Sequence, residues 1–248
     1  MDNIFMREEK KYIISGGQAA VLQKHLAQRM TVDRFGEYLV QNVYFDTDNF
    51  DIISESMEKP LYKEKLRLRF YNQYNPESKG YLELKKKFDG IVYKRRIAFP
   101  LSRLKSKGIT DILSILSADD SQISREIYYF TRINAVCEKI HVEYKRIAYN
   151  DMEDNNLRVT FDRDIFYHLI PANHLSFNKN RRVLNQDQMV LEIKTPGAIP
   201  LWLAGLLSEL EIFPVSFSKV GACYVQMVSG AQRSSKYHGL KEEKENAA

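Results

Sequence analysis

The stretch Leu66-Arg67-Leu68-Arg69-Phe70 decides the fold, because apolar and charged residues alternate strictly along it. Alternate side chains of a β-strand share one face, so Arg67 and Arg69 would project together, about 6.6 Å apart along the strand. The three apolar residues would cover the opposite face. The stretch therefore predicts a strand with one apolar side and one cationic side.

Four further stretches place charged residues at every second position. They are Arg7, Glu9 and Lys11; Glu83, Lys85 and Lys87; Lys94 and Arg96; and Glu192 and Lys194. Two arrangements satisfy this pattern: a sheet with one solvated face, or a closed barrel with a charged interior and helices outside. Cross-strand pairs of Glu83 with Arg69 or Lys94 would suit the first. Paired cations repeated in neighbouring strands favour the second, since a solvated sheet has no need of them.

The composition fits one globular domain. The chain has 248 residues, and its hydrophobic fraction of 44% is enough to build a sizeable core. We expect a single domain over residues 1–230 and a flexible polar tail over 231–248, where the sequence becomes charged and poor in apolar residues. Cys137 and Cys223 lack a CxxC or Cys/His spacing, which predicts free buried thiols rather than a zinc site.

Targeting signals are absent from the sequence pattern. The first residues contain no apolar core of signal-peptide length, and no segment offers the roughly 18 apolar residues of a membrane span. We therefore expect a cytoplasmic protein, for which a membrane-bound partner remains open. The net charge of +5 is too modest to indicate a generic nucleic-acid coat, so no nucleic-acid partner is expected.

Hydrophobic periodicity predicts an α+β arrangement of two antiparallel meanders separated by helices. The expected strands cover 5–14, 37–46, three charged segments centred on Arg67, Lys85 and Lys94, and then 141–149, 157–164 and 184–195. The expected helices cover 15–30, much of 101–137, 201–213, and 218 to about 230. Residues 47–60 are expected to form a polar connection.

A charged interior of this kind must be wet and occupied by a polyanion, because unpaired cations lose most of their solvation in a dry site. The cations expected on the inner side are Lys11, Arg67, Arg69, Lys85, Lys87, Lys94, Arg96, Arg146, Arg158, Lys194 and Lys219. The acids expected beside them are fewer: Glu9, Glu83, Asp162 and Glu192. This excess of cations suits triphosphate or polyphosphate, and the carboxylates suit Mg²⁺ or Mn²⁺ held together with phosphate oxygens.

The ordered motifs resemble the catalytic domain of the vacuolar transporter chaperone complex and its bacterial relatives, within the triphosphate tunnel metalloenzymes. The resemblance covers about residues 5 to 228. It rests on the joint spacing of Arg7-x-Glu9-x-Lys11-Tyr12, Val43-Tyr44-Phe45-Asp46-Thr47, Arg67-x-Arg69-x-Tyr71, Glu83-x-Lys85, Lys94-x-Arg96, Tyr144-x-Arg146, Arg158-x-Thr160-x-Asp162, Glu192-x-Lys194 and Phe217-Ser218-Lys219. It implies an eight-stranded antiparallel β-barrel tunnel wrapped by helices. It also implies polyphosphate synthesis, in which the γ-phosphate of ATP is transferred to a growing chain.

The resemblance implies roles for particular residues. The catalytic cations along the phosphate path would be Lys11, Arg67, Arg69, Lys85, Lys94, Arg146 and Lys219. Hydroxyl contacts to substrate would come from Tyr144 and Ser218, and the inward-facing set adds Lys87, Arg96, Arg158 and Lys194 as substrate contacts. Glu192 would be the main ligand of a divalent metal, and Glu9 corresponds to an acidic motif that many tunnel triphosphatases use for metal.

Two further expectations concern single positions. Arg158 and Asp162 are expected to bridge neighbouring strands, with a structural role for Asp162. Ser216 stands where the resemblance leads us to expect a lysine, which would weaken binding of the chain or processivity.

Other functions remain open at this stage. A tunnel triphosphatase would use the same basic residues and differ only in having water at the acceptor side. A non-catalytic module could bind polyphosphate without any chemistry. The sequence has no GxxxxGK[ST] or GxGxxG loop, so nucleotide binding through a glycine-rich loop is not supported.

Overall fold

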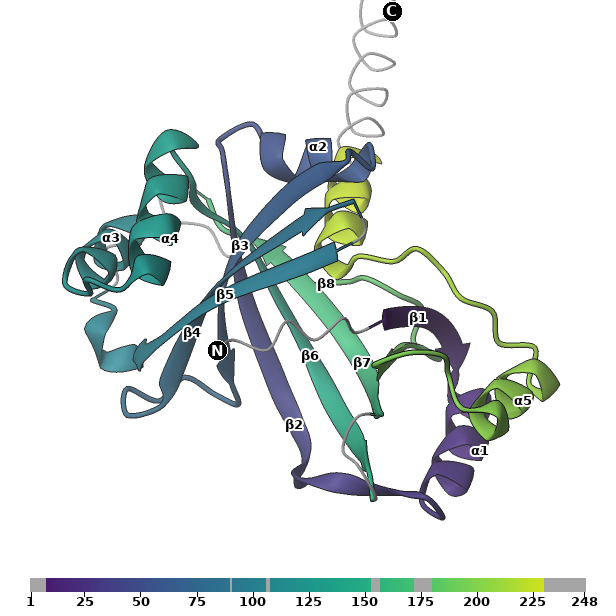
Figure 1. The fold of residues 1–248 in the computed structure, drawn as a ribbon. Coiled ribbons are helices and arrows are strands. Elements are labelled where there is room, and N and C mark those ends of the chain that lie inside the picture. Colours follow the sequence, from purple (N-terminus) through teal and green to yellow (C-terminus); the bar gives the residue numbers. More distant parts are fainter. Residues whose placement is uncertain (1–7, 90, 106–107, 153–156, 172–179, 230–248) are drawn as a thin grey trace, which may run out of the picture.

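The computed structural model describes residues 8–89, 91–105, 108–152, 157–171 and 180–229. Arg7 of the first charged stretch and the predicted tail over 231–248 lie outside the described residues. The fold is α+β, with one large antiparallel sheet and helices packed against both of its faces (Figure 1).

The sheet contains every strand of the described chain, and all its pairings are antiparallel. The main path runs β1-β9-β7-β6-β2-β3-β4-β5, and β8 pairs with β7 at the side. The strands are β1 (Glu8–Ser15), β2 (Met30–Asp46), β3 (Tyr62–Tyr71), β4 (Lys79–Phe88), β5 (Ile91–Pro100), β6 (Cys137–Asp151), β7 (Arg158–Leu169), β8 (Arg181–Arg182) and β9 (Gln188–Thr195).

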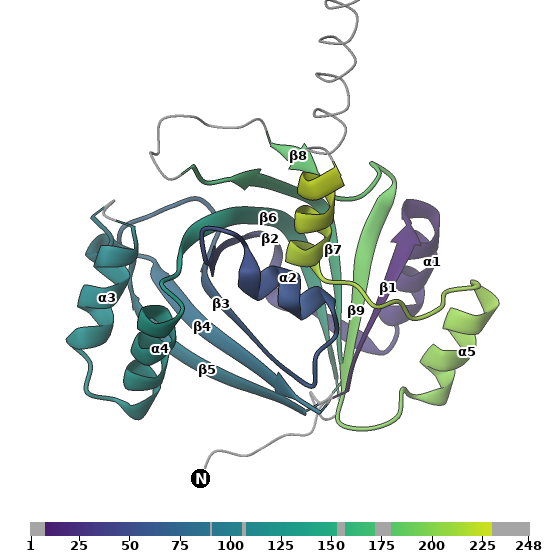
Figure 2. The same ribbon diagram turned by 90° about the horizontal axis from the view of Figure 1, so that it is seen from above.

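The predicted closed barrel is not found. Over the described residues no strand pairing joins β1 to β5, so the sheet is curled but open (Figure 2). The outer edge of β1 is used differently: the backbone N–H of Val215 donates to the carbonyl of Lys11 at 2.7 Å. This contact occupies a group that pairing with β5 would need, which gives a physical reason for the open edge.

Helices cover the convex face in two groups and enter the concave face from one end (Figure 2). They are α1 (Gly16–Leu26), α2 (Asp51–Met57), η1 (Leu101–Arg103), α3 (Ile109–Ser117), α4 (Gln122–Ile133), α5 (Leu201–Glu209) and a helix over 219–229. The start of α1 follows the predicted signal at Ser15, which forms a capping box with Gln18. The expected polar connection 47–60 instead contains α2.

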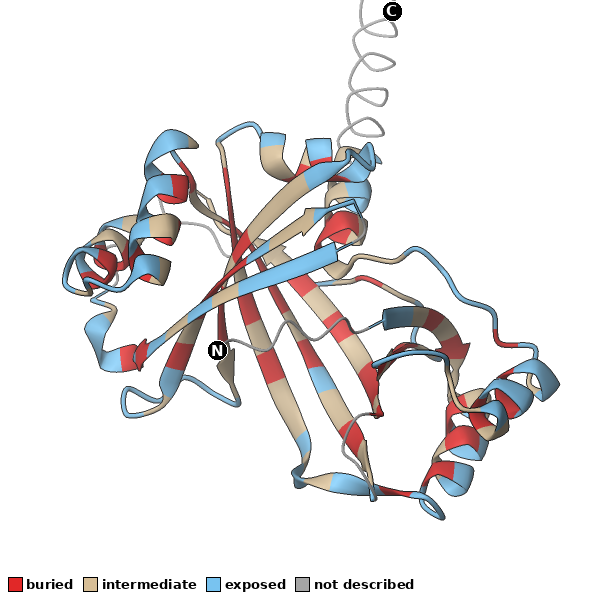
Figure 3. Ribbon diagram, viewed as in Figure 1, coloured by how far each residue is buried: buried red, intermediate tan, exposed pale blue. Residues whose placement is uncertain are grey.

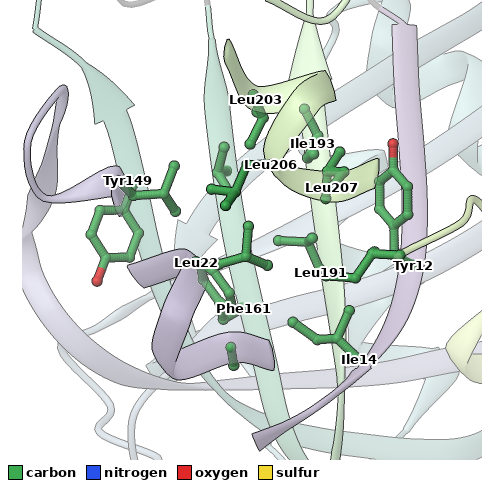
Figure 4. Close-up of a cluster of buried hydrophobic side chains, with 14 of the residues drawn as sticks. Tyr12, Ile14, Leu22, Tyr149, Phe161, Leu191, Ile193, Leu203, Leu206 and Leu207 are labelled. Carbon is green, nitrogen blue, oxygen red and sulfur yellow. The ribbon is translucent and has the colours of Figure 1, made fainter. Parts of the chain in front are cut away.

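Two apolar clusters attach helices to the convex face. Leu22 of α1 and Leu203 of α5 pack with Phe161, Leu191 and Ile193 from the strands (Figure 4). The second cluster packs α3 and α4 against the apolar side of β3 and β4, and its buried members include Leu66, Leu68, Leu82, Leu84, Ile112, Ile127 and Phe130. Both sets come from the positions that alternate with the charged residues, so more and less buried residues alternate along these strands (Figure 3). The apolar half of the sequence pattern is thus confirmed.

A third cluster fills part of the concave face. Val220 and Cys223 of the helix over 219–229 pack against Val142, Ile165 and Tyr167 of the sheet. Residue 218 therefore enters the concave face together with the helix that follows it. The start of this last helix agrees with the prediction.

Asp46 fixes the short helix α2. Its fully buried carboxylate accepts backbone N–H bonds from Thr47 at 2.8 Å and from Ile52 and Ile53 at 2.9 Å. The residue before α2, Phe50, has a left-handed φ of 63° and gives no side-chain cap. The carboxylate of Asp46 thus does the work of a helix cap from a distance.

We predict that Asp46→Ala lowers the free energy of unfolding by about 3 kcal/mol, because three backbone donors lose a charged acceptor. Urea titration followed by circular dichroism measures the change. Asp48→Ala is the control, since the Asp48 side chain is 83% exposed and pairs only at the surface with Lys139. Equal stability of both variants would contradict the assigned role of Asp46.

Candidate functional site

The strand registers bring the charged stretches onto one concave surface, which we call the inner face. Glu83 lies opposite Arg67 on one side and opposite Arg96 on the other. Glu192 lies opposite Lys11 on β1 and opposite Thr160 on β7. Directly opposed residues in a sheet project to the same side. The inner face comprises Glu9, Lys11, Asn42, Tyr44, Lys65, Arg67, Arg69, Glu83, Lys85, Lys94, Arg96, Tyr144, Arg146, Arg158, Thr160, Asp162, Glu192 and Lys194, with Lys219 from the last helix.

Glu83 joins three cations at one part of this face. Its carboxylate accepts from Arg67 Nε at 2.8 Å, from Arg96 Nε at 2.7 Å and from Lys94 Nζ at 2.6 Å. The side chain is only 1% exposed. Burial alone would raise the pKa of Glu83, but the nearby cations Arg67, Arg69 and Lys94 outweigh it and hold the pKa well below its usual range.

The two predicted partners of Glu83 have different outcomes. The pair with Lys94 is present, whereas Arg69 bonds elsewhere. Arg69 donates from Nε to Asn42 Oδ1 at 2.9 Å and from Nη2 to the Tyr144 hydroxyl at 3.2 Å. Arg69 is therefore oriented by neutral oxygens and keeps its full charge for a ligand.

Asp162 anchors a second set of cations. Arg146 contacts it with two donors, Nε at 2.6 Å and Nη2 at 2.7 Å, and Lys219 Nζ lies 2.6 Å from its other side-chain contacts at Oδ2. Asp162 has no exposed surface. Burial opposes its ionisation, but Arg146 and Lys219 keep its pKa lowered. The expected bridge between strands is confirmed for Asp162, which links β7 to β6 and to the last helix.

Glu9 and Glu192 share a lysine. Lys194 Nζ lies 2.6 Å from Glu192 Oε1 and 3.6 Å from Glu9 Oε2, and Lys11 Nζ lies 2.7 Å from Glu9 Oε1. Burial acts to raise the pKa of Glu192, but Lys194, Lys11, Lys219 and Arg146 lower it well below its usual range. Both carboxylates are therefore ionised acceptors beside a bound cation.

Lysines face one another at the next part of the inner face. Lys65 lies opposite Lys85, and Lys63 lies opposite Lys87. The carboxylate nearest to any of their ammonium groups is Glu9, at 3.9 Å from Lys85, among the ion pairs of the described residues. Burial and the neighbours Lys63, Lys85 and Lys11 lower the pKa of Lys65 to about 8. Like charges in direct opposition destabilise a sheet, so this region is suited to an added anion.

The remaining predicted residues lie towards the ends of the face. Lys87 is at the lysine-rich end, opposite Lys63. Arg158 is bound at the other end by Asp33, at 3.4 Å, and by Asn150, at 3.2 Å. Ser218 Oγ accepts from Lys65 Nζ at 3.4 Å and from the backbone N–H of Gly221 at 3.3 Å.

Sequence reasoning missed three members of the inner face: Lys65, Tyr44 and Asn42. Lys65 continues the two-residue period of Arg67 and Arg69, so extending that period by one step would have found it. Tyr44, whose hydroxyl lies 3.4 Å from Arg67 Nη1, and Asn42 carry no charge to mark the pattern. Only the pairing of β2 with β3 places them beside the arginines.

The inner face can position a linear phosphate anion. Arginines held by buried carboxylates offer fixed guanidinium donors, and the opposed lysines supply charge that the protein leaves largely uncompensated. Among the described residues, no three His, Cys, Asp or Glu side chains gather closely enough to hold a metal unaided. No helix in the described part of the chain is long and apolar enough to cross a membrane. Fold and site together define a domain that binds phosphate-rich polyanions.

The sequence matches the VTC domain family over residues 6–228, and the chain belongs to that family. Membership indicates an activity related to polyphosphate or triphosphate. No curated protein sequence matches the chain.

Two solved structures share part of the architecture. One is the PH1819 protein of Pyrococcus horikoshii, with a TM-score of 0.47 and 12% identity over 89% of this chain and 99% of that one. The other is a protein of Vibrio parahaemolyticus whose name marks it as a candidate adenylate cyclase. Its TM-score is 0.46, with 10% identity over 88% of this chain and 97% of that one.

We predict that Glu83→Gln destabilises the protein by about 3 kcal/mol, because three cations lose their buried counter-charge. Tripolyphosphate should restore part of this loss, since a bound anion replaces the missing charge. Urea titration with and without tripolyphosphate provides the measurement. Glu64→Gln is the matched control, because Glu64 pairs with Lys86 on the convex side of the same strands. A loss that tripolyphosphate leaves unchanged would contradict the assigned role.

We also predict that tripolyphosphate binding weakens as the pH rises from 7 to 9. The pKa of Lys65 is lowered to about 8 by burial and by neighbouring lysines, and that of Lys94 to about 8 by burial and the nearby Arg96 and Arg67. Both ammonium groups are therefore charged below pH 8 and lose their protons above it, well before an ordinary lysine does.

Calorimetric titration at pH 7, 8 and 9 tests this dependence. Lys65→Arg should flatten the profile, because a guanidinium stays protonated throughout this range. Ionisation of the ligand affects both proteins equally. Identical profiles for the variant and the unmodified protein would exclude Lys65 as a titrating contact.

Proposed function

We propose that this protein is a polyphosphate polymerase that transfers the γ-phosphate of ATP to the end of a growing inorganic polyphosphate chain. One observation carries the proposal: the inner face combines cations fixed by Glu83 and Asp162 with opposed lysines that lack carboxylates of their own. Membership of the VTC domain family supports the same substrate class.

The chain's own residues supply what phosphoryl transfer requires. The reaction needs positioning and neutralisation of charge on the phosphate oxygens more than covalent help from a side chain. Arg67 and Arg96 are held by Glu83, and Arg146 by Asp162, so these donors need no reorganisation when phosphate arrives. The attacking group would be a terminal oxygen of the polyphosphate chain.

The opposed lysines would set the affinity for a chain rather than for a single phosphate. Lys65 and Lys85 lie beside Lys63 and Lys87 along the same two strands, so their charges extend over successive positions. A linear anion with regularly spaced charges matches such a row better than a compact anion does. Ser218, which binds Lys65, would hold that lysine towards the ligand.

The residues present fit a divalent metal. Glu9 and Glu192 offer oxygen donors, and their shared contact with the ammonium of Lys194 marks the position as one that attracts a cation. One or two carboxylates together with phosphate oxygens are the usual ligands of Mg²⁺. When bound, Mg²⁺ or Mn²⁺ would neutralise charge on the phosphate oxygens, with Lys194 moving to a phosphate.

Incubation with ATP and Mn²⁺, followed by gel electrophoresis and a polyphosphate stain, tests the proposal. We expect a ladder of long products from the unmodified protein and none from Glu192→Gln. The variant should still bind polyphosphate at least as tightly, because it removes a negative charge from the inner face.

The outcomes separate the related activities. Free phosphate without a ladder would identify a triphosphatase and contradict the polymerase. Tight binding of polyphosphate without turnover of ATP would identify a binding module. Glu64→Gln serves as the control, since it removes a carboxylate from the convex side and should leave the ladder unchanged.

A further inference from the structure

A row of four aromatic rings lies along the tyrosine end of the inner face. Phe35 contacts Tyr38, Tyr38 contacts Tyr71, and Tyr71 contacts Tyr81, with ring centroids 6.0, 5.8 and 6.0 Å apart. We call these residues the aromatic row. All three contacts are edge to face, the geometry that aromatic rings prefer.

Arginines lie at both ends of the aromatic row. The guanidinium of Arg34 lies 4.7 Å from the ring centre of Phe35, and that of Arg96 lies 4.9 Å from the ring centre of Tyr81. Aromatic rings interleaved with arginines are the combination that proteins use to stack nucleobases beside phosphates. The phosphate-binding role of the inner face makes no use of these rings.

The aromatic row adjoins the phosphate-binding cations. Tyr38 on β2 lies opposite Arg146 on β6, and Tyr81 on β4 lies opposite Arg69 on β3. Along β3, Tyr71 is separated from Lys63 by eight residues (71 − 63), which is about 26 Å of strand. The rings and the opposed lysines therefore lie at opposite ends of the same face, with the arginines between them.

A β-bulge in β2 presents Phe35 to solvent. The register between β2 and β6 shifts between Val32 and Glu37, and Gly36 has a left-handed φ of 60°. Asp33 stabilises the bulge: Oδ1 accepts from the backbone N–H of Phe35 at 3.1 Å, and Oδ2 accepts from the Tyr38 hydroxyl at 3.5 Å. Bulges commonly redirect a side chain beside a functional site.

The exposure of Phe35 is not explained by packing. Its side chain is 63% exposed although it is held in an ordered bulge. Arg158 also binds Asp33, so a cation predicted to contact substrate is tied to the same bulge. The bulge thus connects an exposed aromatic ring to the phosphate-binding cations.

We propose that the aromatic row binds the adenine ring of the ATP donor, with Phe35 stacked on the base and the triphosphate lying on the neighbouring arginines. The inference rests on the proposed function, because it places the nucleoside half of the same donor. It also gives the inner face a direction: the nucleoside binds at the aromatic row, and the chain extends towards the opposed lysines.

Calorimetric titration of ATP and of inorganic tripolyphosphate tests the inference. Phe35→Ala should weaken ATP binding at least about 5-fold, the loss expected for one stacked base, and should change tripolyphosphate binding less than about 2-fold. Tyr129→Ala is the matched control, because this ring on α4 is 68% exposed and lies outside the aromatic row. It should change neither affinity.

Phe35→Trp supplies a second measurement. It should keep the affinity for ATP, and its fluorescence should be quenched by ATP and not by tripolyphosphate. Trp202 is the only native tryptophan, so the unmodified protein provides the background signal.

Several results would overturn the inference. Unchanged ATP binding in Phe35→Ala, or an equal loss for ATP and tripolyphosphate, would show that the aromatic row does not hold the nucleoside. Tighter binding of oligoadenylate RNA than of ATP, lost in Phe35→Ala, would assign the row to single-stranded RNA instead. Failure of the unmodified protein to bind either tripolyphosphate or ATP would overturn the proposed function together with the inference.

Discussion

The burial of two carboxylates within a cationic surface is the constraint on which the rest of the structure depends. Glu83 and Asp162 each hold more than one cation, and neither has appreciable contact with solvent. Without them, arginines and lysines on adjacent strands would repel one another across a sheet spacing of about 4.8 Å. With them, the strands can be paired while the guanidinium groups keep fixed directions. The same two side chains thus serve the folded state and the recognition of an anion.

The neutralisation is deliberately incomplete in physical terms. The arginines have buried partners, but the opposed lysines at Lys65 and Lys85 have little compensation beyond Glu9. Their destabilising proximity is a cost of the unliganded state, and an anionic ligand relieves it. Binding free energy therefore includes the relief of repulsion as well as new contacts.

The sequence predicted much of this arrangement because a period of two is unambiguous when charged and apolar residues alternate. It identified the strands around Arg67, Lys85 and Glu192 and the side of the sheet on which their charges lie. It could not identify α2, since the buried carboxylate that caps this helix lies outside it in sequence. The partners of Arg69 also escaped prediction, because neutral Asn42 and Tyr144 become neighbours only through long-range strand pairing. Closure of the sheet was predicted wrongly, because patterning describes faces and carries no information about which edges meet.

The contact between Val215 and Lys11 has a consequence for how the chain avoids self-association. An open sheet leaves two edge strands, each a template on which another molecule could polymerise. The segment before residue 218 blocks part of one template with its own backbone, and it leads directly to the helix that carries Lys219. Protection from aggregation and the supply of a cation to the inner face are therefore performed by one continuous piece of chain, so evolution cannot easily shorten that piece without losing both.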